Sequence, residues 1–267
     1  MAPTVTAVLT RPQGRNEALE QALLQRGIPS LILPALQLEA IDFFDEFHHH
    51  PANYDLIVFV SSTAVSCYLE ALRLRSITWP EGLCAASVGA ASASALYRYP
   101  GLSPGLIIHP DESDPDQDSE ALWKQLELRK MKFRRVLIVR GQQGREWLSS
   151  RFADENASVE RVTVYQRVPA FWTDQQSIAL QHALSGDSCV FLLTSSESVC
   201  AMMQNIVRLG MEKSWAKLRF VAIHERIAER LQSELLALGL PQATMLFRSS
   251  PGIDSMCNAI VDAARAN

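Results

Sequence analysis

Two apolar runs in this sequence end in a basic turn. Thr10-Arg11-Pro12 follows the run at residues 5–9, and Arg140-Gly141 follows the run at residues 136–139. An arginine guanidinium can bind a carboxylate through two parallel hydrogen bonds. Residue types and positions therefore point to binding of an anion. The GxSxG turn that would indicate an acyl-transfer serine is missing from the sequence.

Two further apolar runs end in hydroxyl side chains, namely Ser61-Ser62 and Ser195-Ser196. A helix is expected directly after each pair, so each pair supplies a helix N-cap in the first place. Helix N-termini present free N–H groups and the positive end of the helix dipole, and therefore attract anions. Capping and anion binding are compatible roles for these serines.

The turn Gly141-x-x-Gly144 is a weak phosphate-loop signal, because neither GxxxxGK[ST] nor GxGxxG is present. A simple strand-to-helix turn explains it equally well. His224 ends the run at residues 218–223, where a surface or capping role is favoured over a catalytic one. The run His48–His50 precedes a proline in a polar stretch and predicts a solvated loop, and no metal site is expected.

Tyr165 is the side chain best suited to proton transfer. It ends a β-branched run at residues 159–165 and leads into Gln166-Arg167-Val168-Pro169, where the chain is expected to leave its domain. A phenol at such a place can pack against a hinge, and it can also donate a proton to a bound substrate.

Apolar runs of strand length alternate with helical patterns along the whole chain, which predicts βαβ units and parallel sheets. The pattern repeats: residues 8–15 resemble 138–145, residues 59–65 resemble 193–199, and residues 86–89 resemble 221–224, at offsets near 130–135 residues. The repeat indicates two α/β domains of about five strands each, with a ligand cleft between them. Strand counting allows a cut into two contiguous halves near residues 129–135.

The ordered motifs resemble the uroporphyrinogen-III synthases of bacteria. The resemblance covers essentially the whole chain, and it rests on the following segments: Leu9–Pro12, Phe59–Val65, Val88–Ala93, Val139–Gly141, Tyr165–Pro169 and Leu193–Ser196. The chain departs from the family pattern at Thr63, where asparagine is frequent, at Ser92, where threonine is usual, and at His224–Arg226, where a Gly-x-Thr turn is common.

The resemblance implies two flavodoxin-like domains with parallel five-stranded sheets, joined by a two-stranded connector. Domain one would comprise residues 1–36 and 170–267, and domain two residues 42–163. The connectors would lie at about residues 37–41 and 164–169. This division is discontinuous in sequence, unlike the contiguous halves.

The resemblance also implies the reaction. The family cyclises hydroxymethylbilane, a linear tetrapyrrole with eight carboxylate side chains, to uroporphyrinogen III, with loss of water and inversion of ring D. No metal or organic cofactor is expected. Tyr165 would assist departure of the hydroxyl. The expected substrate-binding residues are Thr10, Arg11, Pro12, Ser61, Ser62, Ser92, Arg140, Gly141, Ser195, Ser196 and His224.

Other classes of protein remain open. Two α/β domains with a cleft also describe a solute-binding or sensor protein without catalysis, and a nucleotide-dependent enzyme is disfavoured by the missing glycine fingerprints. The net charge of −4 argues against a nucleic-acid binder. The five widely spaced cysteines, and a first segment unlike a signal peptide, indicate a cytoplasmic protein. We expect a monomer, with hydroxymethylbilane synthase as candidate partner for substrate hand-off and no membrane partner.

Overall fold

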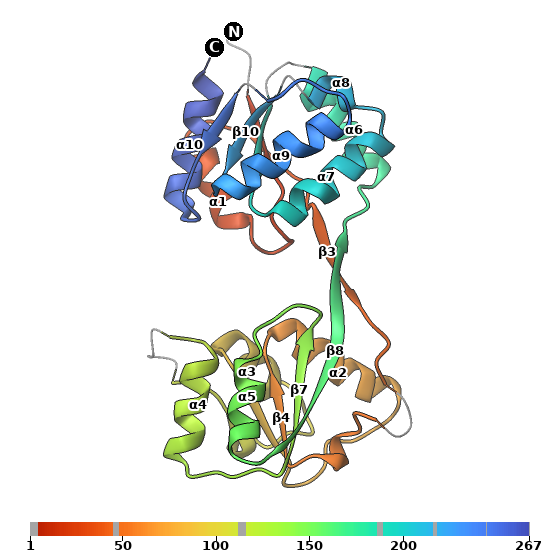
Figure 1. Ribbon diagram of the computed structural model, residues 1–267, viewed down its shortest axis with the longest axis vertical. Coiled ribbons are helices and arrows are strands. Elements are labelled where there is room, and N and C mark those ends of the chain that lie inside the picture. Colours follow the sequence, from red (N-terminus) through yellow and green to blue (C-terminus); the bar gives the residue numbers. More distant parts are fainter. Residues whose placement is uncertain are drawn as a thin grey trace. The chain divides into compact units, whose positions relative to one another are not determined.

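The computed structural model describes residues 5–44, 48–111, 116–185, 189–215, 218–243 and 245–266. The chain divides into two compact units. Unit 1 comprises residues 1–37 and 168–267, and unit 2 comprises residues 38–167. In Figure 1 the red and blue ends of the chain both lie in unit 1, whereas orange, yellow and green elements make up unit 2.

Unit 1 is built on a five-stranded sheet of order β11-β10-β9-β1-β2. All the neighbouring strands are parallel. Its strands are β1 (Thr6–Leu9), β2 (Ser30–Ile32), β9 (Cys189–Leu193), β10 (Arg219–Ala222) and β11 (Leu246–Arg248). Its helices are α1 (Glu17–Leu24), α6 (Asp174–Ser185), α7 (Ser196–Arg208), α8 (Glu212–Trp215), α9 (Glu225–Ala237) and α10 (Ile253–Arg265).

Unit 2 carries the second sheet, of order β3-β8-β7-β4-β5-β6. Its strands are β3 (Leu36–Ala40), β4 (Leu56–Phe59), β5 (Cys84–Ser87), β6 (Ile107–Ile108), β7 (Arg135–Gly141) and β8 (Ser158–Pro169). Its helices are α2 (Ser62–Leu74), α3 (Ala90–Tyr97), α4 (Ser119–Leu128) and α5 (Trp147–Asp154), with 3-10 turns η1 (Pro51–Asn53) and η2 (Pro104–Leu106).

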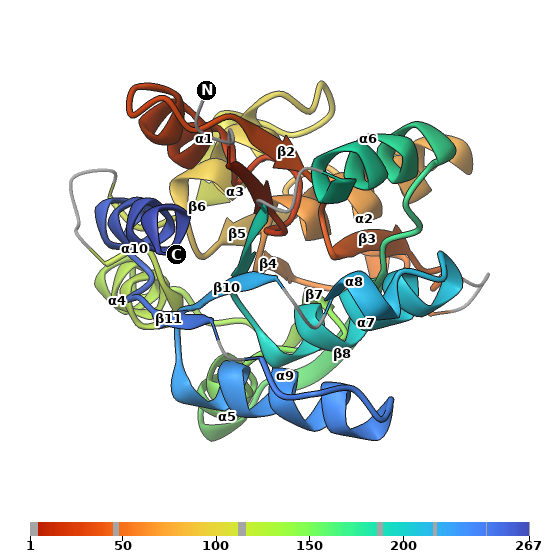
Figure 2. The ribbon, with the colours of Figure 1, turned by 90° about the horizontal axis from the view of Figure 1, so that it is seen from above.

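Each sheet is covered by helices on both faces, which explains the continuous apolar runs of the central strands. In unit 1, α1 and α10 cover the face that carries Leu9, and α7 and α9 cover the face that carries Val8. Figures 1 and 2 both show α7 and α9 side by side. In unit 2, α2 and α3 cover the face of Phe59, and α4 and α5 cover the face of Val58.

The two sheets have the same strand order when the repeat is followed. Unit 1 reads 2-1-3-4-5 in its own chain order, which is the flavodoxin-like order. Unit 2 reads the same if β7 and β8 are taken as its first two strands and β4, β5 and β6 as the others. In the repeat, β1 is thus equivalent to β7, and β4 is equivalent to β9. Each unit combines two strands from one sequence repeat with three from the other.

The α/β fold with two parallel-rich sheets is confirmed, and three details differ from expectation. The second sheet has six strands because β3, counted as a connector, pairs with β8. Backbone bonds from Ile41 N to Val164 O (3.0 Å) and from Ala170 N to Ala35 O (2.9 Å) show that this pair is antiparallel. A cut near residues 129–135 is wrong, since these residues lie inside unit 2. The helix expected from Arg145 begins at Trp147.

Candidate active site

The predicted serines stand where the strands of both sheets reach their carboxyl ends. Ser61 follows β4 and caps α2, since its Oγ accepts a hydrogen bond from Ala64 N at 3.1 Å. Ser195 follows β9 and caps α7 in the same way, accepting from Ser198 N at 3.0 Å. The two caps share extended backbone angles, so the repeat is preserved at atomic detail.

The ends of β5 and β10 are also followed by helix caps. Gly89 precedes α3 and His224 precedes α9, both with extended backbone. The His224 ring accepts a hydrogen bond from Arg226 N at 3.2 Å, through Nδ1. The capping role favoured for this histidine is therefore present. In unit 2 the amide of Gln117 replaces a side-chain cap, because its Oε1 accepts from Ala90 N at 3.0 Å.

Tyr165 lies against the end of β7 and reaches β4. Its hydroxyl is 3.2 Å from Ser61 Oγ. The pairing of β7 with β8 slips between Arg140 and Gly141, so that Gly141 stands opposite Tyr165 and Val164 has no partner on β7. Such a bulge redirects the side chains that follow it. Val164 and Tyr165 consequently both pack against the α2-covered face of the sheet.

Gly141 is required by the closeness of the Tyr165 ring. A Cβ at residue 141 would lie 2.6 Å from Tyr165 Cζ and 2.9 Å from its hydroxyl oxygen. Those separations are far below van der Waals contact, so any side chain there would displace the phenol. Gly141 therefore leaves the room that the Tyr165 ring occupies, and the substrate contact expected for Gly141 stays a prediction.

Arg140 is turned inward. Only 8% of its surface is exposed. The guanidinium donates to Gly144 O at 2.8 Å and to Glu146 Oε1 at 2.6 Å. A Cβ at Gly144 would lie 2.9 Å from Arg140 Nη2, which explains the second glycine of the turn. These donors of Arg140 are engaged within the turn, and the substrate contact expected for this residue stays a prediction.

Glu146 was not expected at the site, and it joins two arginines. Its carboxylate accepts from Arg140, and Arg161 of β8 pairs with its other oxygen. The hydrogen bond from Arg140, followed by that from Arg161, lowers the pKa of Glu146 below its ordinary value. No sequence motif marks Glu146, because it acts only through the fold of this turn.

The basic turn of unit 1 is arranged differently. Thr10 is fully buried and its hydroxyl donates to Leu192 O, so its side chain links β1 to β9 and is not presented to a ligand. Asn16 donates from Nδ2 to Arg11 O at 3.0 Å and, more weakly, to Pro12 O. Arg11 and Pro12 are half-buried. Among the described residues the Arg11 guanidinium has no ion-pair partner.

The remaining predicted residues lie on the first turns of helices. Ser62 is exposed at the start of α2, and Ser196 is half-buried at the start of α7. Ser92 is 4% exposed on the inner side of α3, where its hydroxyl has little access to a ligand. In the described part of the chain, no three His, Cys, Asp or Glu side chains are grouped closely enough to hold a metal ion.

None of the described helices combines the length and the apolar character needed to cross a membrane. The five cysteines are all free thiols. Cys189 is buried in β9, and this burial raises the pKa of its thiol to about 11. Such thiols are poor nucleophiles at neutral pH because the thiolate is the reactive form.

Comparison with known proteins identifies the family. Residues 17–242 match the family described as uroporphyrinogen-III synthase HemD. The uroporphyrinogen-III synthase of Proteus mirabilis is 25% identical over 61% of this chain and 81% of its own length, and that of Salmonella typhimurium 25% identical over 84% and 89%. A solved uroporphyrinogen-III synthetase from Helicobacter pylori aligns over 97% of this chain and 99% of its own, with 14% identity and a TM-score of 0.49. Because the family match spans most of the sequence, the chain belongs to the uroporphyrinogen-III synthase family.

Proposed function

We propose that the chain converts hydroxymethylbilane to uroporphyrinogen III, with loss of water and inversion of ring D. The observation that carries this proposal is the Tyr165 phenol of β8, held on Ser61 beside the carboxyl ends of β4 and β7. Ligands of open α/β sheets bind at the carboxyl ends of the strands. A proton donor at that edge suits a reaction that begins with departure of a hydroxyl group.

We assign Ser61 as the donor to Tyr165. Ser61 Oγ accepts the Ala64 N–H, and its own hydrogen can point at the Tyr165 oxygen 3.2 Å away. The Tyr165 hydrogen is then available to the substrate. Tyr165 donates it to the departing hydroxyl, the C–O bond breaks, and water leaves while the pyrrole nitrogen supplies the electron pair. Proton loss at the end of the cyclisation returns the hydrogen to the phenolate.

The protein's main contribution is positioning. The linear substrate must bend so that its reactive carbon meets the substituted carbon of ring D, where a spiro-pyrrolenine intermediate forms before ring D is inverted. Holding two reacting atoms together can supply a large part of a rate acceleration. Gly141 supports this by leaving room for the Tyr165 ring to lie flat on the strand end.

The substrate's carboxylates require cationic and N–H partners. The free N–H groups at the starts of α2, α7 and α9 are suited to carboxylates. We assign Ser62, Ser196 and His224 to this role, because they lie on or beside those first turns. Arg11 is the fourth candidate residue, and its guanidinium has no ion-pair partner among the described residues. Thr10, Arg140 and Ser195 shape the turns that carry these groups.

The decisive experiment supplies purified protein with freshly made hydroxymethylbilane and resolves the product isomers after oxidation. We expect the type III isomer, since the spontaneous reaction closes the ring without inversion and gives type I. Formation of type I alone, at the uncatalysed rate, would overturn the proposal and favour a binding protein without catalysis. Absorbance during turnover also reports whether any added metal chelator changes the rate, and we expect no change.

The connector strands β3 and β8 support a division of the chain into two domains. We infer domains at residues 1–36 with 170–267 and at 42–163, because β3 and β8 pair with each other where the chain passes between the units. We also infer a monomer acting in the cytoplasm, a compartment that suits five free thiols. Light scattering during gel filtration tests the monomeric state, because a monomer has the chain mass of 29.7 kDa.

A further inference from the structure

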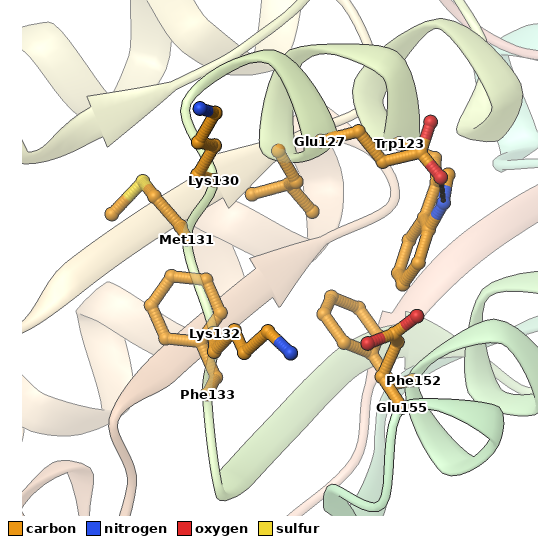
Figure 3. A pocket seen from close by; sticks show the side chains of 9 residues that line it. Trp123, Glu127, Lys130, Met131, Lys132, Phe133, Phe152 and Glu155 are labelled. Atoms are coloured by element: carbon orange, nitrogen blue, oxygen red, sulfur yellow. Dashed lines mark hydrogen bonds between the residues drawn. The ribbon is translucent and has the colours of Figure 1, made fainter.

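The loop between α4 and β7 is strongly basic although the protein carries a net negative charge. Residues 129–135, which are this loop and the first residue of β7, contain five cations and no carboxylate: Arg129, Lys130, Lys132, Arg134 and Arg135. The loop precedes β7, so it lies at the amino end of this sheet, away from the strand ends that carry Tyr165 and Ser61. Together with α4 and α5 it lines a cavity of about 340 Å³ (Figure 3).

The wall of this cavity is apolar and largely aromatic. It is formed by Trp123 and Leu126 of α4, Met131 and Phe133 of the loop, and Phe152 of α5. Trp123 and Phe152 meet edge to face, with ring centroids 5.1 Å apart and an interplanar angle of 78°. The volume lies at the lower end of the range for small-molecule sites. A flat apolar body fits such a wall best, because aromatic rings favour edge-to-face and offset contacts.

The charges at the cavity are not equally available. Glu127 accepts a hydrogen bond from Trp123 Nε1 at 2.7 Å and forms an ion pair with Arg151 at 3.9 Å, and Arg135 pairs with Asp55 at 3.6 Å. Lys130 and Lys132 are exposed and form no ion pair within the described part of the chain. Figure 3 shows Lys132 extending toward Phe152 and Glu155.

The uncommitted charges therefore favour an anion. Of the charged residues that line the cavity, Lys130, Lys132 and Glu155 have no ion-pair partner among the described residues, so two unpaired positive charges stand against one negative charge. Arg129 and Arg134 add positive charge from the same loop. Clusters of one sign around an apolar concavity concentrate ligands of the opposite sign.

We propose that this cavity binds an organic anion with a flat aromatic body. The rings of the ligand insert against Trp123, Phe133 and Phe152, and its acidic group lies at the mouth on Lys132 and Lys130. The site is separate from the one assigned to hydroxymethylbilane, because its residues lie at the opposite ends of the strands. The proposal stands on the cavity and its charges and does not depend on the reaction that the chain catalyses.

Titration calorimetry with 2-naphthoate tests the site on the full-length protein. We expect saturable binding of one equivalent, weaker by about ten-fold for the neutral isostere 2-naphthalenemethanol, because half-exposed ion pairs each contribute a factor of a few. Octanoate, an aliphatic anion, is expected to bind more weakly than naphthoate. Equal affinity for the acid and its neutral isostere contradicts the charge argument, and tighter binding of octanoate contradicts the aromatic one.

Two charge-reversal variants sharpen the test. Lys130→Glu with Lys132→Glu should weaken naphthoate binding by roughly ten-fold or more. Lys124→Glu with Lys213→Glu changes the net charge equally, at exposed residues that do not line the cavity. That control should bind like the unaltered protein. If both pairs weaken binding alike, a general charge effect explains it and the site is not at this cavity.

Filling the cavity provides the second line of evidence. Met131→Trp adds bulk to a half-buried lining residue and should abolish naphthoate binding while the thermal midpoint stays near that of the unaltered protein. Tyr165→Phe should leave naphthoate binding unchanged. Unaltered binding by a folded Met131→Trp variant, or loss of binding in Tyr165→Phe, overturns the proposal, because the probe then lies elsewhere.

Discussion

The Tyr165 hydroxyl lies 3.2 Å from Ser61 Oγ, although 104 residues separate the two in the chain. Three neighbouring strands produce this meeting, since β7 pairs with β4 on one side and with β8 on the other. The bulge at Arg140–Gly141 turns Tyr165 onto the end of β7, and the N-cap of α2 supplies the serine. The phenol is thus held by rigid elements and not by a loop.

Tyr165→Phe removes the proton donor and keeps the ring. We expect kcat for type III product to fall by about 10²-fold, at the lower end of what general acid catalysis contributes, because water can replace an assisting acid in part. KM should change little. Tyr97→Phe is the matched control, since Tyr97 is exposed on α3 and its hydroxyl bonds His109. A Tyr165→Phe enzyme with unchanged kcat removes the acid role.

Ser61→Ala has two separable effects. Loss of the N-cap should lower the free energy of unfolding by about 1 kcal/mol. Loss of the contact to Tyr165 should lower kcat by about five-fold, as expected for one hydrogen bond of about 1 kcal/mol. Asp118→Ala is the control, because Asp118 caps α4 by accepting from Ala121 N at 2.9 Å and follows β6, which three strands separate from β8.

Urea unfolding and steady-state kinetics on both variants separate the two effects. The control should lose stability and keep kcat. An equal fall of kcat in Asp118→Ala would mean that destabilisation alone explains the result for Ser61.

Gly141→Ala should act through Tyr165. The added methyl group would lie 2.6 Å from Tyr165 Cζ, so the ring must leave Ser61. We expect kcat to fall about as far as in Tyr165→Phe, with a stability loss of about 1–3 kcal/mol from overpacking. Adding Gly141→Ala to Tyr165→Phe should then lower kcat no further. Gly105→Ala is the control, since nothing lies within 4 Å of a Cβ there.

Several of these features follow from sequence patterns, for identifiable reasons. The buried strands are continuous apolar runs because helices cover both faces of each sheet. The serine caps are recognisable because an N-cap needs a side-chain acceptor directly before the helix. The repeat between residues 59–65 and 193–199 corresponds to equivalent strands in the two sheets. Such signals are local, and local signals are what a single sequence carries.

The inward orientation of Arg140 could not be predicted from the sequence. Its ion pair with Glu146 depends on the backbone path of residues 141–146. The bulge beside Gly141 leaves no residue-type signature. The division of the chain was ambiguous because either partition gives five strands per domain, and only the observed strand neighbours show which strands share a sheet.

Glu146 gives the protein a specific pH dependence. Hydrogen bonds from Arg140 and then Arg161 lower its pKa in the folded protein, and this favourable interaction is present only while the carboxylate is charged. The contribution is therefore complete above the ordinary value of 4.5 and is lost as pH falls below it toward the lowered pKa. Urea midpoints should fall less steeply through this window in Glu146→Gln than in the unaltered protein. Glu229→Gln, an exposed change on α9, should keep the original slope.

The strand neighbours also predict which pieces of the chain fold alone. Residues 36–169 contain all six strands of the second sheet. Residues 1–130, the first sequence repeat, lack β7, the central strand that pairs with β4. The former fragment should unfold cooperatively in urea, whereas the latter should not, because its central strand edge and apolar faces remain uncovered. Circular dichroism across a urea series measures both. A cooperative transition in residues 1–130, or none in residues 36–169, contradicts the reciprocal exchange of strands between the two repeats.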